Sequence, residues 1–197
     1  MVANPRYPYW QQAGGQITNF GGKATVWQAA DQTLTRPANT TAYAAGNAIG
    51  SSSSVVFSFT NFFWQPGSSG ILTGLRWVVN GSGIGSSNVG STYAHLYLSS
   101  PTAAAGLVDQ SVYPLKIADD ALKLGTVLLN TTVTGGTGSD MVEVYGQQII
   151  STQHLIGLQS SGATPGSGTL YAVLVANSTP IPLASQVNYL YASGVMD

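Results

Sequence analysis

The sequence lacks cysteine altogether, so disulfide bonds, iron–sulfur clusters and thiolate chemistry are excluded. The fold must be stabilised by packing alone, which suits assembly in a reducing compartment. The first residues lack the basic-then-apolar pattern of a signal peptide. No apolar run approaches the ~18 residues that indicate a membrane span, and the run at residues 170–176 has the length of a strand. These features predict a soluble protein without an export signal.

Charged residues are also scarce, at 7% of the chain against roughly 25% in an average soluble domain. The formal net charge is -1 and the six basic residues are scattered, whereas phosphate binding requires clustered Lys and Arg. Nucleic acid is therefore not expected as a partner. The surface must be covered by small and polar residues, as in residues 35–54, where Arg36 is the single charge. Low net charge removes the repulsion that keeps molecules apart, so this surface favours association.

The motifs of common enzyme classes are absent, including G-x-S-x-G, G-x-G-x-x-G, a P-loop lysine and H-E-x-x-H. His95 and His154 fall in predicted strands, and we interpret both as sheet histidines that are satisfied by a neighbour or by water. Glu143 is the only glutamate, and glycoside hydrolysis usually needs two opposed carboxylates, so we interpret it as a charge on a polar strand face. The other acidic residues stand in no recognised context: Asp31, Asp109, Asp119, Asp120, Asp140 and Asp197. We expect a protein that is not an enzyme and holds no cofactor or metal.

The sequence does contain the alternation of side chains between two faces that is typical of β-strands. Residues 54–64 place Val55, Phe57 and Phe59 on one side and Val56, Ser58, Thr60 and Phe62 on the other. This period of two predicts a half-buried strand. Residues 71–80 predict a second strand, in which Gly74 marks a bulge. Further strands are predicted at residues 24–30, 40–45, 92–100, 126–133, 141–146, 154–159, 169–177 and 187–193.

Turn-rich joints of Gly, Pro, Ser and Asn separate these strands. One helical turn is predicted at residues 118–125, with Asp119 or Asp120 as its N-cap and Gly125 as its C-cap. Many short strands separated by turns are typical of an all-β, two-sheet antiparallel sandwich, here expected to be jelly-roll-like. We predict an extended N-terminal arm at residues 1–23 and a single β-sandwich domain at residues 24–197.

The arm carries the residues that we expect to bind a partner. These are Pro5, Arg6, Tyr7, Tyr9 and Trp10. The prolines favour extended geometry, and Tyr, Trp and Arg are enriched in binding hot spots. An arm that packs across its own domain remains an alternative.

Aromatic residues suggest a second kind of binding. The chain has 4 Trp and 10 Tyr, and aromatic rings on a β domain can stack on sugars. Trp64 and Tyr113 fall near predicted turns and are candidate sugar platforms, whereas Trp77 alternates into a strand and is expected to face the core. Exposed aromatics mark protein interfaces as readily as ligand sites.

Several phrases of the sequence occur in an order that is similar to one family. They are "LTRPANTTAYAAGNAIGSS" from residue 34, "GILTGLRWVVNG" from residue 70, "HLYLSSPT" from residue 95, "LKIADDALKLGTV" from residue 115 and "LYAVLVANSTPIPLASQ" from residue 170. Over residues 34–186 the chain resembles a family of small tailed-bacteriophage virion proteins. It departs from that family at Asn47, where an aspartate is usual, and in its aromatic N-terminus.

The resemblance implies a capsid decoration (cement) protein that performs no chemistry. Its implied partners are the major capsid protein and further copies of itself, assembled as a trimer. Its implied place is the outer surface of the virion capsid, after synthesis in the host cytoplasm. The alternative is a tail or fibre component that binds a sugar or another part of the host surface.

Overall fold

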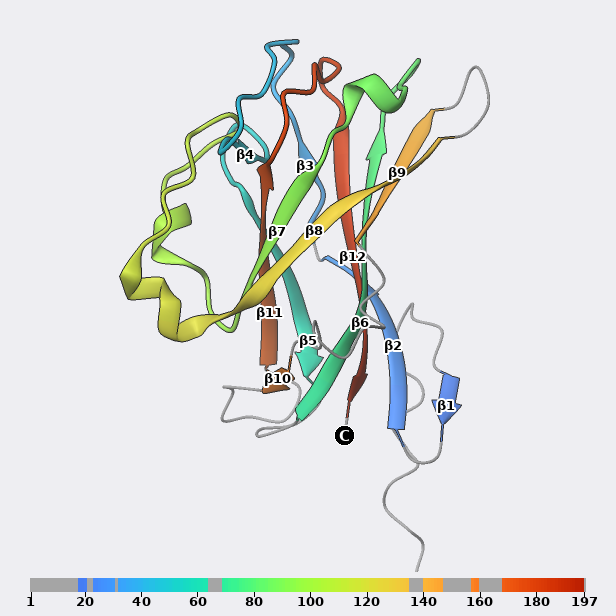
Figure 1. Cartoon of the computed structure of the whole chain (residues 1–197), viewed down its shortest axis with the longest axis vertical. Coiled ribbons are helices and arrows are strands. Elements are labelled where there is room, and N and C mark those ends of the chain that lie inside the picture. The colour runs from blue at the N-terminus through green and yellow to red at the C-terminus, as the bar shows by residue number, and fades with distance from the viewer. Residues whose placement is uncertain are drawn as a thin grey trace, which may run out of the picture.

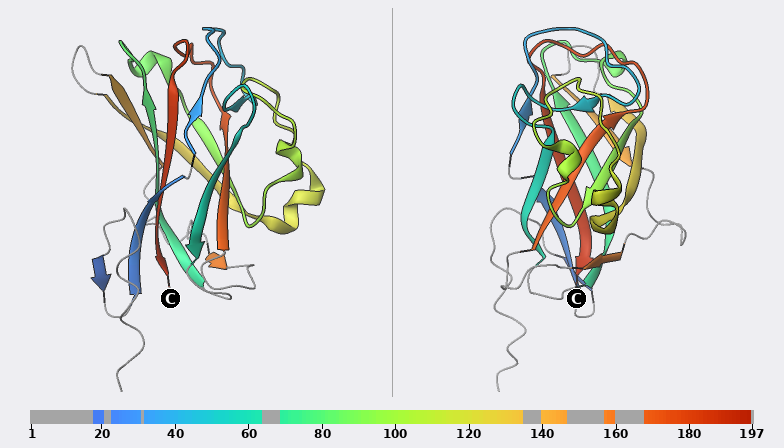
Figure 2. Two further views of the ribbon diagram at one scale, coloured as in Figure 1. Left: turned by 180° about the vertical axis from the view of Figure 1, so that it is seen from behind. Right: turned by 90° about the vertical axis from the view of Figure 1, so that its left-hand side faces the viewer.

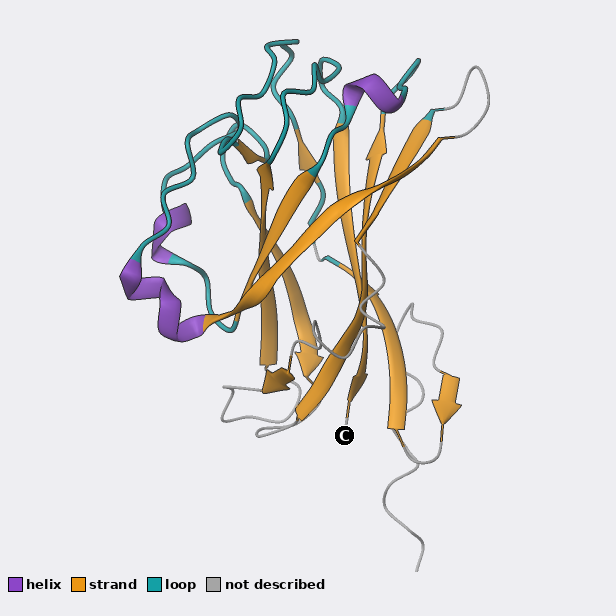
Figure 3. Cartoon of the chain, viewed as in Figure 1, coloured by secondary structure: helices purple, strands orange, loops and turns teal. Residues whose placement is uncertain are grey.

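The computed structural model describes residues 18–20, 23–30, 32–63, 69–134, 140–146, 157–159 and 168–196. Strands dominate these residues, as Figure 3 shows. The strands are β1 (Thr18–Phe20), β2 (Lys23–Ala29), β3 (Leu34–Thr35), β4 (Ala48–Ile49), β5 (Val56–Phe63), β6 (Ser69–Asn80), β7 (Thr92–Tyr97), β8 (Lys123–Thr134), β9 (Met141–Gly146), β10 (Gly157–Gln159), β11 (Gly168–Ala176) and β12 (Val187–Met196). Short 3₁₀ helices are η1 (Ser86–Asn88), η2 (Thr102–Ala104) and η3 (Ile117–Leu122).

The strands of the described residues form one antiparallel sheet. Its order is β1-β2-β12-β6-β9-β8-β7-β11-β4, and β3, β5 and β10 pair with β12, β11 and β6. The sheet curls into a half-barrel, so its two halves face each other across the core (Figures 1 and 2). The all-β antiparallel class is confirmed, but the prediction of a two-sheet sandwich is wrong.

Strand β8 is the physical reason for the single sheet. Its first half pairs with β7, where Thr126 lies opposite His95, and its second half pairs with β9, where Thr132 lies opposite Val144. The register shifts between Leu129 and Thr131, and a bulge of this kind bends a strand and increases its twist. One long bent strand therefore joins the two halves of the sheet, where a break in β8 would have separated them.

Most predicted strands agree with the structure to within a few residues at their ends. The predicted bulge at Gly74 is confirmed, because Ser193 pairs with Gly74 while the next residue, Gly194, pairs with Leu72. The strand predicted at residues 40–45 is absent from the structure. There the backbone instead bonds to loops and side chains, and Tyr43 N donates to the carbonyl of Pro180 over 3.0 Å.

The inner face of the curled sheet forms the main core. Trp77 faces this core as predicted, and its indole Nε1 donates to Asn188 Oδ1 over 3.1 Å. Phe57 and Phe59 are buried as their alternation predicted. Phe62 is buried as well, although strict alternation placed it on the other side. The pairing of β5 with β11 is irregular at this point, which breaks the period of two.

Strand β11 is buried on both faces. Ala172 and Leu174 belong to the main core, whereas Val173 and Val175 belong to a second cluster outside the sheet. This arrangement explains the continuous apolar run at residues 170–176, because a strand covered on both faces needs no polar alternation. The cover over the outer face of β11 is the segment that joins β7 to β8.

Candidate interaction surface

Residues 98–122 connect β7 to β8 and contain η2 and η3; we call this segment the β7–β8 connection. It lies outside the sheet, at the left of Figure 1. Ala103, Ala104 and Tyr113 of the connection pack with Val173 and Val175 of β11. The connection is therefore a folded layer on the sheet. Two sets of contacts hold it against the rest of the molecule, and a third closes it on itself.

The first contact is a buried ion pair between Arg36 and Asp109. The Nε of Arg36 lies 2.9 Å from Asp109 Oδ2, and both side chains are completely buried. Asp109 Oδ1 accepts hydrogen bonds from the Tyr43 hydroxyl over 2.6 Å and from the backbone N–H of Gly50 over 2.9 Å. The remaining guanidinium donors bind Asn39 and the carbonyl of Leu183. Each charge is thus surrounded by partners, which a buried charge requires.

Gly50 belongs to this contact for a steric reason. A Cβ atom at position 50 would lie 2.4 Å from the carbonyl oxygen of Ser54 and 2.8 Å from the Cα of Val55. Only glycine fits this close approach to residues 54 and 55, and its N–H donates to Asp109 from this position. The pKa of the Tyr43 hydroxyl is raised, first by burial and then by the neighbouring Asp109 carboxylate. Tyr43 therefore stays a neutral donor.

The second contact is aromatic. The Tyr113 ring stacks on His95 with centroids 5.7 Å apart, and its hydroxyl donates to the hydroxyl of Tyr97 over 3.0 Å. Tyr113 is only 6% exposed, so the prediction of an exposed sugar platform at this residue is wrong. His95 Nδ1 lies 3.0 Å from Thr126 Oγ1, which confirms a sheet histidine satisfied by a neighbour. Burial, with a smaller effect of Lys123, lowers the pKa of His95 to about 4.

The third contact closes the connection on itself. Asp119 accepts hydrogen bonds from the backbone N–H groups of Thr102 and Ala103 and from the Thr102 hydroxyl, each over 2.8 Å. Burial alone would raise the pKa of Asp119, but these bonds and the nearby Lys116 outweigh it and lower the pKa. The predicted capping is wrong. Asp119 instead binds the start of η2, and the cap residues of its own helix, η3, are Lys116 and Lys123. Gly125 lies inside β8.

The outward side of the connection is apolar. Among the described residues, five of the seven exposed large hydrophobic side chains belong to it: Val108, Val112, Leu115, Ile117 and Leu122. Ile117 is 95% exposed, Val112 72% and Leu115 67%. Burying apolar area contributes roughly 25 cal/mol per Å², so a group of exposed apolar side chains on one segment is a candidate interaction surface.

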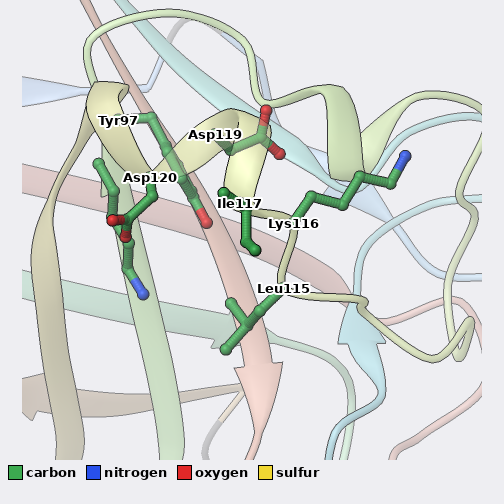
Figure 4. A pocket seen from close by; sticks show the side chains of 7 residues that line it. Tyr97, Leu115, Lys116, Ile117, Asp119 and Asp120 are labelled. Carbon is green, nitrogen blue, oxygen red and sulfur yellow. The ribbon is translucent and has the colours of Figure 1, made fainter.

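A hollow of about 280 Å³ adjoins two of these side chains, Leu115 and Ile117. It is lined by Tyr97, Leu115, Lys116, Ile117, Asp119, Asp120 and Lys123. Figure 4 shows Leu115, Ile117 and Tyr97 around the same space, with charged residues of η3 and its flanks at the margin. We call Leu115, Ile117 and this hollow the docking surface. Its apolar centre and charged margin resemble the anatomy of protein interfaces.

Other predicted site residues lie elsewhere. Glu143 lies on a strand face as predicted, partly exposed and 3.1 Å from Arg76. His154, Trp64 and the predicted partner-binding residues lie outside the described part of the chain; the latter are Pro5, Arg6, Tyr7, Tyr9 and Trp10. Within the described part, no group of three or more His, Asp or Glu side chains is placed to hold a metal ion. No helix in that part has the length and hydrophobicity to cross a membrane.

The docking surface had no signal in the sequence that local rules would detect. Leu115 and Ile117 alternate with Lys116, which alone is typical of a half-buried strand, yet all three residues are exposed in the structure. Comparisons with known proteins add no assignment. No protein-family model matches the chain, and no curated protein matches it.

Replacing Asp109 with asparagine tests the buried ion pair. The Asp109→Asn variant should lose about 3–5 kcal/mol of unfolding free energy, because the Arg36 charge stays buried without its partner. Glu143→Gln is the matched control, since it breaks a partly exposed pair with Arg76 and should cost about 1 kcal/mol or less. Equilibrium denaturation measures both, and equal losses in the two variants would contradict the anchoring role.

The lowered pKa of His95 predicts a pH dependence of stability. The unfolded chain binds a proton at His95 near pH 6.5, whereas the folded chain does so only near pH 4. The unfolding free energy should therefore be fully present above pH 6.5 and fall as the pH drops to about 4, by at most about 3 kcal/mol. His95→Gln should flatten this part of the profile in denaturation experiments. An unchanged slope in the variant would show that other groups cause it.

Proposed function

We propose that this chain is a capsid decoration protein of a tailed bacteriophage. It binds the outer surface of the shell, contacts the major capsid protein and bridges neighbouring capsomers. It catalyses no reaction, and its contribution is interface area that resists the pressure inside the particle. It is made in the host cytoplasm and assembles with copies of itself as a trimer.

The docking surface is the observation that carries this proposal. A protein with so few charges has little repulsion from neighbours, and its most exposed apolar residues lie together on one folded segment. Weak apolar contacts of this kind become strong when symmetry repeats them over a shell, because each further contact forms within an assembly already bound. We assign the major capsid protein as the occupant of the docking surface.

The sequence resemblance supports the same role. Its first phrase supplies Arg36, Asn39, Tyr43 and Gly50, all of which bond within the buried network around Asp109. One of the phrases that resemble the virion family therefore contributes residues that fix the β7–β8 connection. We further propose that Pro5, Arg6, Tyr7, Tyr9 and Trp10 add a second contact with the shell or with a neighbouring copy.

The alternative, a tail or fibre component that binds sugar through Trp64 and Tyr113, has less support. Tyr113 is buried against His95 and its hydroxyl is bonded to Tyr97, so its ring is not available for stacking. The decoration role does not depend on either aromatic residue.

Polar substitutions in the docking surface test the proposal. Leu115→Ser and Ile117→Ser should each weaken binding to purified shells by about tenfold or more, because burying such a side chain is worth about 1.5–3 kcal/mol. Both side chains are exposed, so the variants should fold normally. Co-sedimentation with shells that lack the chain measures the binding.

Ile181→Ser is the matched control, because Ile181 is 58% exposed but lies outside the docking surface. Its binding to shells should equal that of the wild type. Equal binding by all three variants and the wild type would show that the docking surface does not contact the shell. No binding by the wild-type chain would overturn the decoration role itself.

A further inference from the structure

The outer face of β12, β6 and β9 carries a compact group of tyrosines around an ion pair. Tyr191 of β12 and Tyr145 of β9 lie directly opposite Arg76 of β6, one on each side. In the next row, Tyr189 and Glu143 flank Val78 in the same way. The tyrosines, Arg76 and Glu143 are partly exposed, and we call these five residues the tyrosine face.

The polar groups of the tyrosine face hold one another in a single arrangement. The Arg76 guanidinium lies over the Tyr191 ring, 4.4 Å from its centroid, and its Nη1 donates to Glu143 Oε1 over 3.1 Å. The Tyr145 hydroxyl donates to Glu143 Oε2 over 2.5 Å, and this bond is the main reason that the pKa of Tyr145 is raised. A carboxylate and a guanidinium fixed in this way are pre-organised for a ligand, because binding need not order them.

The same groups retain capacity for further hydrogen bonds. A carboxylate offers about four acceptor positions and a guanidinium five donors, more than the bonds within the tyrosine face use. Arg76 Nε is buried and has no hydrogen-bond partner among the described residues. This donor is not accessible to a ligand, so further bonds would use the terminal guanidinium nitrogens.

We propose that the tyrosine face binds a carbohydrate. The apolar C–H side of a sugar ring packs on Tyr145 and Tyr189, because the Arg76 guanidinium already lies over the Tyr191 ring. The sugar hydroxyls donate to Glu143 and accept from Arg76. The charged pair offers hydrogen-bond donors and acceptors in the middle of the face, and the aromatic residues lie around it. This arrangement suits a ligand that is rich in hydroxyls. The proposal goes beyond shell binding and does not depend on it, because the docking surface comprises different residues.

A glycan array probed with the purified full chain tests this inference. The array should carry bacterial surface polysaccharides, and laminarin and dextran serve as soluble probes. We expect the wild type to bind a subset of these glycans. Glu143→Gln should weaken that binding at least tenfold by removing the acceptor charge. Tyr145→Phe should also weaken it, because the ring remains but the hydroxyl that positions Glu143 is lost.

Tyr171→Phe is the matched control, since Tyr171 is a partly exposed strand tyrosine of β11 outside the tyrosine face, and its glycan binding should be unchanged. Leu115→Ser should also keep glycan binding, which separates this site from the docking surface. The inference is overturned if the wild type binds no glycan, or if Glu143→Gln and Tyr145→Phe bind as well as the wild type. Loss of shell binding in these two variants with no glycan bound would assign the face to a protein partner instead.

Discussion

The buried ion pair of Arg36 and Asp109 is the constraint on which the position of the β7–β8 connection depends. Through Arg36 it joins the strand end at residue 36 to the carbonyl of Leu183, and through Asp109 it joins the loop at Gly50 to the β7–β8 connection. A buried ion pair often adds little net stability compared with apolar packing, but it requires close geometry and hydrogen bonds to its remaining donors and acceptors. In this molecule that geometry fixes where the connection lies on the sheet.

The curl of the sheet explains why the connection is needed. Strand β11 presents apolar side chains on both faces, and the inner ones are covered by the opposite half of the sheet. The outer ones, Val173 and Val175, are covered by the connection through Ala103, Ala104 and Tyr113. The connection forms a single layer of chain over β11, and its outer side faces solvent. Leu115 and Ile117 are exposed on that side.

Local patterns in the sequence predict those parts of the structure that are determined by residues close to one another along the chain. Strand positions, the bulge at Gly74 and the inward direction of Trp77 follow from alternation and from glycine's lack of a side chain. The number of sheets could not be predicted, because it depends on β8 pairing with different strands at its two ends.

The candidate site escaped prediction for a related reason. Arg36 and Asp109 lie 73 residues apart in sequence, and neither has a local pattern that indicates burial. Tyr113 was expected at the surface because turns flank it, but the sheet beneath it supplies His95 and Tyr97 as partners. The continuous apolar run of β11 was the one available signal, since it indicates that something must cover the outer face.

The central claim, that this chain decorates a shell, is tested most directly by its copy number in virus particles. Quantitative mass spectrometry of purified particles of the encoding virus would compare this chain with the major capsid protein. Our account predicts copies on the same scale as the shell subunits, as a decoration layer requires. A handful of copies per particle would place the chain in a tail or fibre, and its absence from the particles would contradict a virion role altogether.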